Sequence, residues 1–66
     1  MSKHDARLLQ HANTTTDKPF HVFGYGVVMK HTILYWSSFD EIGHALDFKD
    51  RLKGGYVTDR DGKEID

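Results

Sequence analysis

Cysteine is absent from this chain, so neither a disulfide framework nor a thiolate metal site can stabilise it. The sequence also lacks a signal-peptide pattern and any apolar run long enough to span a bilayer. These absences predict a protein of a reducing compartment with no membrane partner, and we expect a cytoplasmic location. Proline occurs once, at Pro19, and therefore interrupts the chain at one place only.

An excess of charge of either sign is missing as well. Nine lysines and arginines face ten acidic residues, which gives a formal net charge of −1. No field of the whole molecule therefore attracts nucleic acid or anionic lipid. The 66 residues suffice for one domain with a small core. Without disulfides, association with another chain is the expected additional source of stability.

The segment 1–18 is polar and ends in a run of Asn, Thr and Asp before Pro19. Proline disfavours helical geometry in the preceding residue, so this segment is predicted to be a flexible N-terminal arm, and residues 19–66 are predicted to form the single domain. The arm contains a short amphipathic pattern, formed by Ala6, Leu8, Leu9 and Ala12. Isolated helices of this length are marginal in water, so we expect this one to form only against a partner.

Residues 20–36 are rich in β-branched and aromatic types and predict a β-hairpin. The turn is expected around residues 29–31, with residues 24–26 as the alternative. Lys30-His31 is a poor pair for a two-residue turn, so the pattern favours a three-residue or longer loop. An odd-length loop would place the even-numbered residues of both strands on one face of the sheet.

Ser38 and Glu41 have the spacing of a capping box and predict the start of a helix. Its apolar positions recur with helical periodicity, and Gly54 after Lys53 predicts its end. A short strand at 56–58, a turn at 59–62 and a brief final strand at 63–65 follow. The fold class is therefore α+β: a small antiparallel sheet with one helix packed on one face, in the order β-β-α-β with an optional last β, and a disordered N-terminal arm.

An odd-length loop assigns the two faces of the hairpin. The even positions would form the core beneath the helix: Phe20, Val22, Gly24, Gly26, Val28, Leu34 and Trp36. The odd positions are also largely apolar, although a single helix covers only one side of a sheet. One interpretation is that the arm or the C-terminal strand covers this second face, or that the register differs; the other is a binding surface. Its candidate partner-binding residues are Phe23, Tyr25, Ile33, Tyr35, Tyr56 and Arg60.

Catalytic and metal-binding patterns are weak in this sequence. The five histidines show no ligand spacing, and the segment 59–62 reads as a turn rather than a calcium loop. The only Ser/His/Asp grouping is formed by Ser37, Ser38, Asp40 and His44, in which Ser38 is already assigned as a helix cap. We therefore expect no metal, no cofactor and no enzymatic activity.

The pattern favours a protein-binding module whose partner is a host or cellular protein. The order of elements resembles that of the phage inhibitors of bacterial RNA polymerase, through residues 18–20 opening the first strand, 38–41 opening the helix and 55–57 opening the next strand. The resemblance implies a phage-encoded inhibitor or regulator of a host enzyme. Two alternatives stay open: a single-stranded nucleic-acid-binding protein with an aromatic face, disfavoured by the charge, and a homodimeric structural domain.

Overall fold

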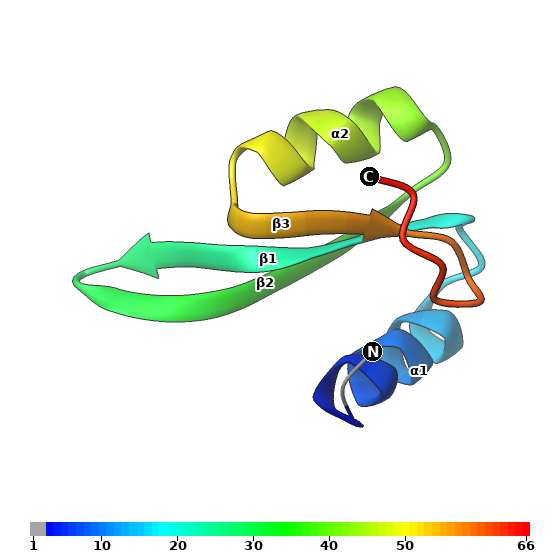
Figure 1. The fold of residues 1–66 in the computed structure, drawn as a ribbon, viewed down its shortest axis with the longest axis horizontal. Coiled ribbons are helices and arrows are strands. Elements are labelled where there is room, and N and C mark those ends of the chain that lie inside the picture. Colours follow the sequence, from blue (N-terminus) through cyan, green and yellow to red (C-terminus); the bar gives the residue numbers. More distant parts are fainter. Residues whose placement is uncertain (1–2) are drawn as a thin grey trace.

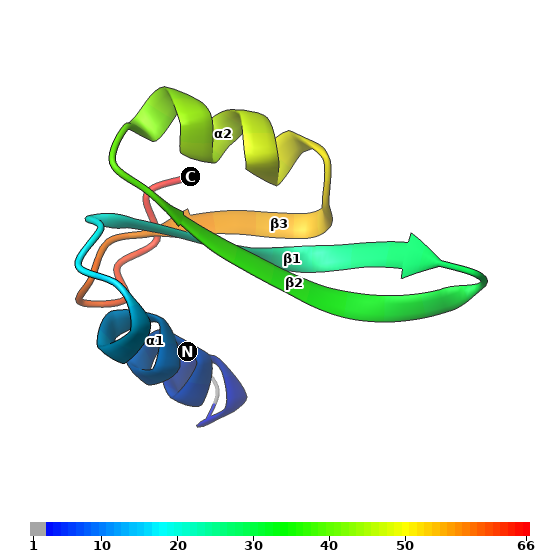
Figure 2. The same ribbon diagram turned by 180° about the vertical axis from the view of Figure 1, so that it is seen from behind.

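The computed structural model describes residues 3–66, so Met1 and Ser2 of the expected arm lie outside the described residues. Five elements follow one another along the chain: α1 (Lys3–Thr15), β1 (Phe20–Val28), β2 (His31–Phe39), α2 (Ile42–Asp50) and β3 (Lys53–Thr58). The strands form one antiparallel sheet in the order β2-β1-β3, with α2 on one face and α1 at one end of the other (Figure 1, Figure 2). The predicted class, a small antiparallel α+β domain with a helix packed on the sheet, is confirmed.

Strands β1 and β2 are joined by a two-residue turn, not by the three-residue loop expected from the sequence. Met29 and Lys30 have φ values of 50° and 71°, and Val28 pairs directly with His31. Positive φ at both central residues is the geometry of a type I′ turn, whose twist matches that of antiparallel strands. Neither residue is glycine or asparagine, so strand pairing stabilises a turn that its own residues disfavour.

The even loop length exchanges the two faces of β2 relative to the expectation. Phe23 pairs with Trp36 and Tyr25 pairs with Leu34, so these residues share the α1 face of the sheet. Leu34 and Trp36, expected in the core beneath the helix, are therefore on the opposite side. Tyr35, in turn, pairs with Gly24 and lies on the α2 face.

The core between the sheet and α2 is small and largely aliphatic at its centre. Val22, Ala45 and Val57 are fully buried there. Five partly buried residues pack around them: Phe20, Phe39, Leu46, Phe48 and Leu52. Gly24 allows a close approach in this layer, since a Cβ atom at this position would lie 2.8 Å from Leu52 Cβ. A β-bulge beside Gly24 shifts the β1–β3 register between Phe23 and Tyr25.

The start of α2 differs from the predicted capping box. The helix begins at Ile42, and Glu41 is its N-cap residue without a side-chain capping hydrogen bond. Ser38 belongs to β2, because pairing of Phe20 with Phe39 continues the strand past the expected helix start. The helix ends at Asp50, earlier than expected. Gly54 has the predicted positive φ, 62°, but lies in β3.

The N-terminal segment differs most from the expectation of a flexible arm. Residues 3–15 form α1, and the buried Ala12 lies against the rest of the chain. The ring of His11 contacts Trp36 edge-on, with ring centroids 5.5 Å apart. The amphipathic pattern found in the sequence thus has its partner within the same chain, because the turn geometry brings Trp36 to this face.

The turn between β1 and β2 supplies a direct test of the register. We expect Lys30→Gly to raise the free energy of unfolding by about 1 kcal/mol, because glycine removes the cost of a left-handed residue at this position. Chemical denaturation would measure the change. Lys63→Gly is the matched control, since Lys63 is an exposed lysine outside the positive-φ positions. An equal or greater gain in the control would contradict the assigned turn.

Candidate functional site

A buried histidine lies at the centre of the contacts between α1 and the sheet. His21 in β1 is 0% exposed; its Nδ1 lies 2.6 Å from Ser38 Oγ and its Nε2 lies 2.7 Å from Asn13 Oδ1. The Asn13 side-chain nitrogen donates to the carbonyl oxygen of Arg60 at 2.7 Å, so Asn13 Oδ1 is the acceptor for His21. His21 Nε2 therefore carries the proton, and Nδ1 accepts from the Ser38 hydroxyl. The neutral ring has both nitrogens satisfied.

Arg60 holds the C-terminal end of α1. Its guanidinium donates to the carbonyl oxygens of Asn13 at 3.0 Å, Thr16 at 2.7 Å and Lys18 at 3.1 Å. These carbonyls lie at and just beyond the negative end of the helix dipole, where a cation is stabilising. Arg60 was a candidate partner-binding residue, and in the structure its Nη1 and Nη2 atoms donate to backbone carbonyls within the chain. It fastens α1 to the segment that follows β3.

The electrostatics of this network favour an uncharged histidine. Burial and the nearby Arg60 guanidinium together hold the pKa of His21 below its ordinary range. Thr58, the residue paired with His21 on β3, is also buried, and its hydroxyl has no hydrogen-bond partner among the described residues. Burial and the Arg60 guanidinium are therefore what disfavour a positive charge on His21.

Ser38, His21 and Asn13 together have the connectivity of an activated nucleophile, its base and an orienting group. The environment of His21 disfavours the protonation that such a triad requires of its base. A general base must accept a proton and become imidazolium, which burial and Arg60 both disfavour, and Asn13 supplies no negative charge to stabilise it. We interpret the network as a structural latch for α1. Sequence reasoning missed this network, because Asn13, His21 and Ser38 belong to three different elements or segments of the chain.

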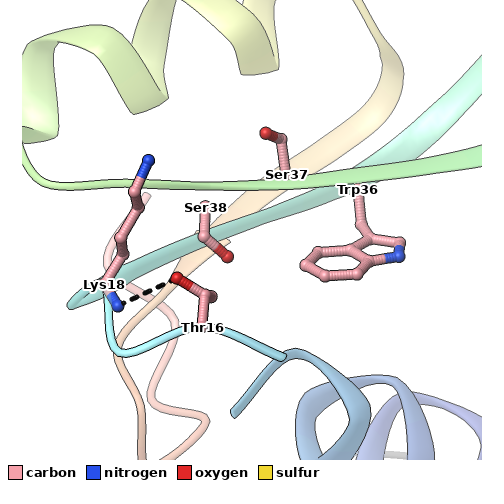
Figure 3. A pocket seen from close by; sticks show the side chains of 5 residues that line it. All are labelled: Thr16, Lys18, Trp36, Ser37 and Ser38. Atoms are coloured by element: carbon pink, nitrogen blue, oxygen red, sulfur yellow. Dashed lines mark hydrogen bonds between the residues drawn. The ribbon is translucent and has the colours of Figure 1, made fainter. Parts of the chain in front are cut away.

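An open hollow of about 240 Å³ lies beside this latch, at the outer edge of β2. It is lined by Thr16, Lys18, Trp36, Ser37 and Ser38. Figure 3 shows Trp36 and Ser38 pointing toward α1, whereas Ser37 points to the opposite side of the strand. The backbone amide of Lys18 donates to Thr16 Oγ1 at 3.3 Å, which orders the link along one wall of the hollow.

The largest concentration of exposed apolar side chains lies on the β1–β2 hairpin. We call it the hairpin patch: Tyr25 (45% exposed), Val27 (55%), Val28 (43%), Met29 (88%), Ile33 (42%) and Tyr35 (37%). The turn end of the hairpin projects past β3 and both helices, so neither helix covers it (Figure 1). A Cβ at Gly26 would lie 2.7 Å from the Tyr35 ring, so this ring packs over the glycine.

The structure separates the six residues predicted to bind a partner. Tyr25, Ile33 and Tyr35 belong to the hairpin patch, although on different faces of the hairpin. Phe23, expected on the binding face, is 2% exposed and lies on the face of the sheet that α1 covers. Its ring contacts that of Tyr56, which is only half-buried, at 5.6 Å. Val27 and Met29 fall on the odd-numbered positions of the expected binding face but were not among the six candidates, and Val28, expected in the core, is 43% exposed.

Among the residues whose side chains the structure describes, 6–66, no group of three or more His, Asp or Glu could hold a metal ion. The helices in this part of the chain are too short and too polar to cross a membrane. Comparison of the chain with protein-family models, with curated proteins and with solved structures found no match in any of the three. The geometry of the chain itself is therefore the basis for a functional proposal.

The lowered pKa of His21 predicts that acid destabilises the fold. The unfolded chain takes up a proton near pH 6.5, whereas the folded chain does so only at lower pH. The stabilisation by neutral His21 is therefore complete above about pH 6.5 and is lost as the pH falls toward the folded-state pKa. Urea unfolding at several pH values would measure the slope. In His21→Gln the slope between pH 6.5 and 5 should be smaller; an unchanged slope would contradict the assignment.

Arg60 supplies a second prediction about the latch. We expect Arg60→Lys to lower the free energy of unfolding by about 2 kcal/mol, because a single ammonium cannot reproduce the planar fork that bonds three carbonyls. Hydrogen exchange of the α1 amides should accelerate as well. Arg51→Lys is the control, since Arg51 is exposed. Unchanged exchange in the Arg60 variant would show that the guanidinium does not hold α1.

Proposed function

We propose that this chain is a small, non-enzymatic protein-binding module whose contact surface is the hairpin patch. The observation that carries the proposal is the gathering of six exposed apolar residues toward the turn end of the hairpin, which neither helix covers. Contiguous apolar surface on a small protein is typical of interaction sites. Tyrosine and methionine are also enriched at protein interfaces, where they supply contact area and adapt to a partner.

The composition of the patch supports a protein partner over a single-stranded nucleic acid. Lys30 is the only charged residue within the hairpin, so few phosphates could be neutralised there. A stacking platform would also need Phe23 and Tyr56 at the surface, and Phe23 is buried. The disfavoured protonation of His21, in the Ser38–His21–Asn13 arrangement that resembles a catalytic triad, supports a non-enzymatic role.

The partner that we propose to test first is a host enzyme. The order of elements after Pro19, two strands, a helix and a strand, resembles that of phage inhibitors of bacterial RNA polymerase, although residues 38–39 end β2 and do not open the helix. RNA polymerase is therefore the partner we propose to test, and an inhibitor or regulator encoded by a phage is the proposed role. Such a target lies in the cytoplasm, which also suits a chain without cysteine.

The patch can be tested by placing charge in its centre. We expect the double variant Val27→Asp, Met29→Asp to lower capture of the partner from bacterial lysate at least tenfold, since a desolvated carboxylate opposes burial of this surface. Purified RNA polymerase would be assayed in parallel. Aspartate tolerates the left-handed conformation at position 29 better than most residues do, so the turn should persist.

Ile65→Asp is the matched control for this experiment. Ile65 is 44% exposed, as Tyr25 is at 45%, but lies in the C-terminal segment away from the hairpin. It should retain full capture. Equal capture by the patch variant and the wild type, with both folded by circular dichroism, would contradict the proposed surface. Failure of RNA polymerase alone would exclude that partner and leave the surface in place.

A further inference from the structure

The two edges of the sheet differ in whether their backbone groups are paired. On the β3 edge, Val57 N donates to Asp66 O at 2.8 Å, and Ile65 N donates to Val57 O at 2.7 Å. The C-terminal residues thus occupy that edge, and the Lys49–Asp66 ion pair at 3.2 Å holds them. On the β2 edge, no backbone hydrogen bond to another segment is found in the described part of the chain. The β3 edge is thus paired at Val57 and Thr58, whereas no such pairing is found on the β2 edge of the described chain.

The open edge lacks the usual protections against strand pairing. Strand β2 runs for nine residues, His31–Phe39, without lysine, arginine, acidic residue or proline. Its register with β1 is continuous, so no bulge twists the edge away. Edge strands of monomeric proteins normally carry one of these devices. Their absence over a long strand indicates an edge that another strand covers.

We propose that the covering strand is β2 of a second copy of this chain. The two strands run antiparallel about a twofold axis centred on Leu34 and join the two sheets into one of six strands. This inference goes beyond the proposed function, because it concerns the backbone edge of β2 and leaves the β1 residues of the hairpin patch available. A symmetric dimer also supplies the stability that so short a chain cannot obtain from disulfides.

The alternation of the hairpin ladder selects the groups that face outward. In a two-residue hairpin the pair next to the turn, Val28 and His31, is the hydrogen-bonded one. The backbone groups of odd-numbered β2 residues therefore point to β1, and those of even-numbered residues point to the open edge. A twofold axis at Leu34 places the outward groups of the two copies opposite each other, as an antiparallel ladder requires.

The side chains are self-complementary in this register. Ile33 lies opposite Tyr35 of the second copy on one face, and the two Leu34 side chains meet on the other. Aromatic pairs with β-branched residues and aliphatic pairs are favourable across antiparallel strands. An axis shifted by one residue, to Tyr35, would instead place Ile33 opposite Ser37. The chosen register therefore buries the apolar residues of β2 against one another.

The two ends of the strand are complementary as well. Lys30 precedes β2, and Asp40 and Glu41 follow it. In an antiparallel pair the lysine end of one copy lies beside the acidic end of the other, whereas a parallel pair would bring like charges together. The hollow at Trp36, Ser37 and Ser38 lies along the same edge, where the start of the partner's β2 would pass (Figure 3).

Charged substitutions at Leu34, on the proposed twofold axis, test both the dimer and its register. The wild type should show a sedimentation-equilibrium mass that rises above 7.6 kDa toward twice that value with concentration. Leu34→Lys and Leu34→Glu, each alone, should dimerise at least tenfold more weakly, since like charges lie directly opposite. An equimolar mixture of the two variants should restore the dimer as a heterodimer, because lysine then faces glutamate.

Ile65→Lys is the matched control, as it places the same charge on an exposed apolar residue beside the β3 edge, away from the open edge. It should dimerise as the wild type does. A wild type that stays at 7.6 kDa up to millimolar concentration would overturn the dimer. If each Leu34 variant alone dimerises as strongly as the mixture does, the position of the axis is wrong. Circular dichroism of each variant checks that a lower sedimentation mass reflects weaker dimerisation and not unfolding.

Discussion

The two-residue turn between β1 and β2 is the constraint on which the rest of this structure depends. Met29 and Lys30 both adopt positive φ, and this choice fixes which residues of β2 share a face with those of β1. A loop longer by one residue would move every β2 side chain to the other face. Trp36 would then leave α1, and Tyr35 would leave Gly26. The strain of two non-glycine residues is offset by a ladder of nine residue pairs.

The second constraint is the latch that fastens α1 to the sheet. A short amphipathic helix is marginal by itself, so its stability comes from Asn13, His21 and Arg60 acting together. The network is fully satisfied when His21 is neutral, and burial keeps it so. Acid therefore weakens the contact that holds the N-terminal helix. Ser38, His21 and Asn13 thus contribute partly buried hydrogen bonds to the contact between α1 and the sheet.

With the two helices placed at one end, the turn end of the hairpin is left without cover. Both of its faces carry apolar side chains, and the outer edge of β2 carries unused backbone groups. These two features serve different contacts. The side chains on the two faces can bind a foreign protein, whereas the self-complementary β2 edge can pair with a second copy. A dimer joined at the edge would leave the β1 residues of both hairpin patches available on one continuous sheet.

Local sequence determined the class of fold, the hairpin, the strand at 56–58 and the positive φ of Gly54, because propensity and periodicity act over a few neighbouring residues. It also identified Tyr25, Ile33 and Tyr35 as candidate contact residues, and the structure leaves them exposed. Only the tertiary structure decided the loop length, the start of α2, the burial of Phe23 and the role of Ser38. Each depends on partners distant in the chain: Ser38 bonds His21 rather than capping a helix, and Arg60 bonds residues more than forty positions away. No local pattern records such pairings, since they exist only after the sheet has brought the segments together.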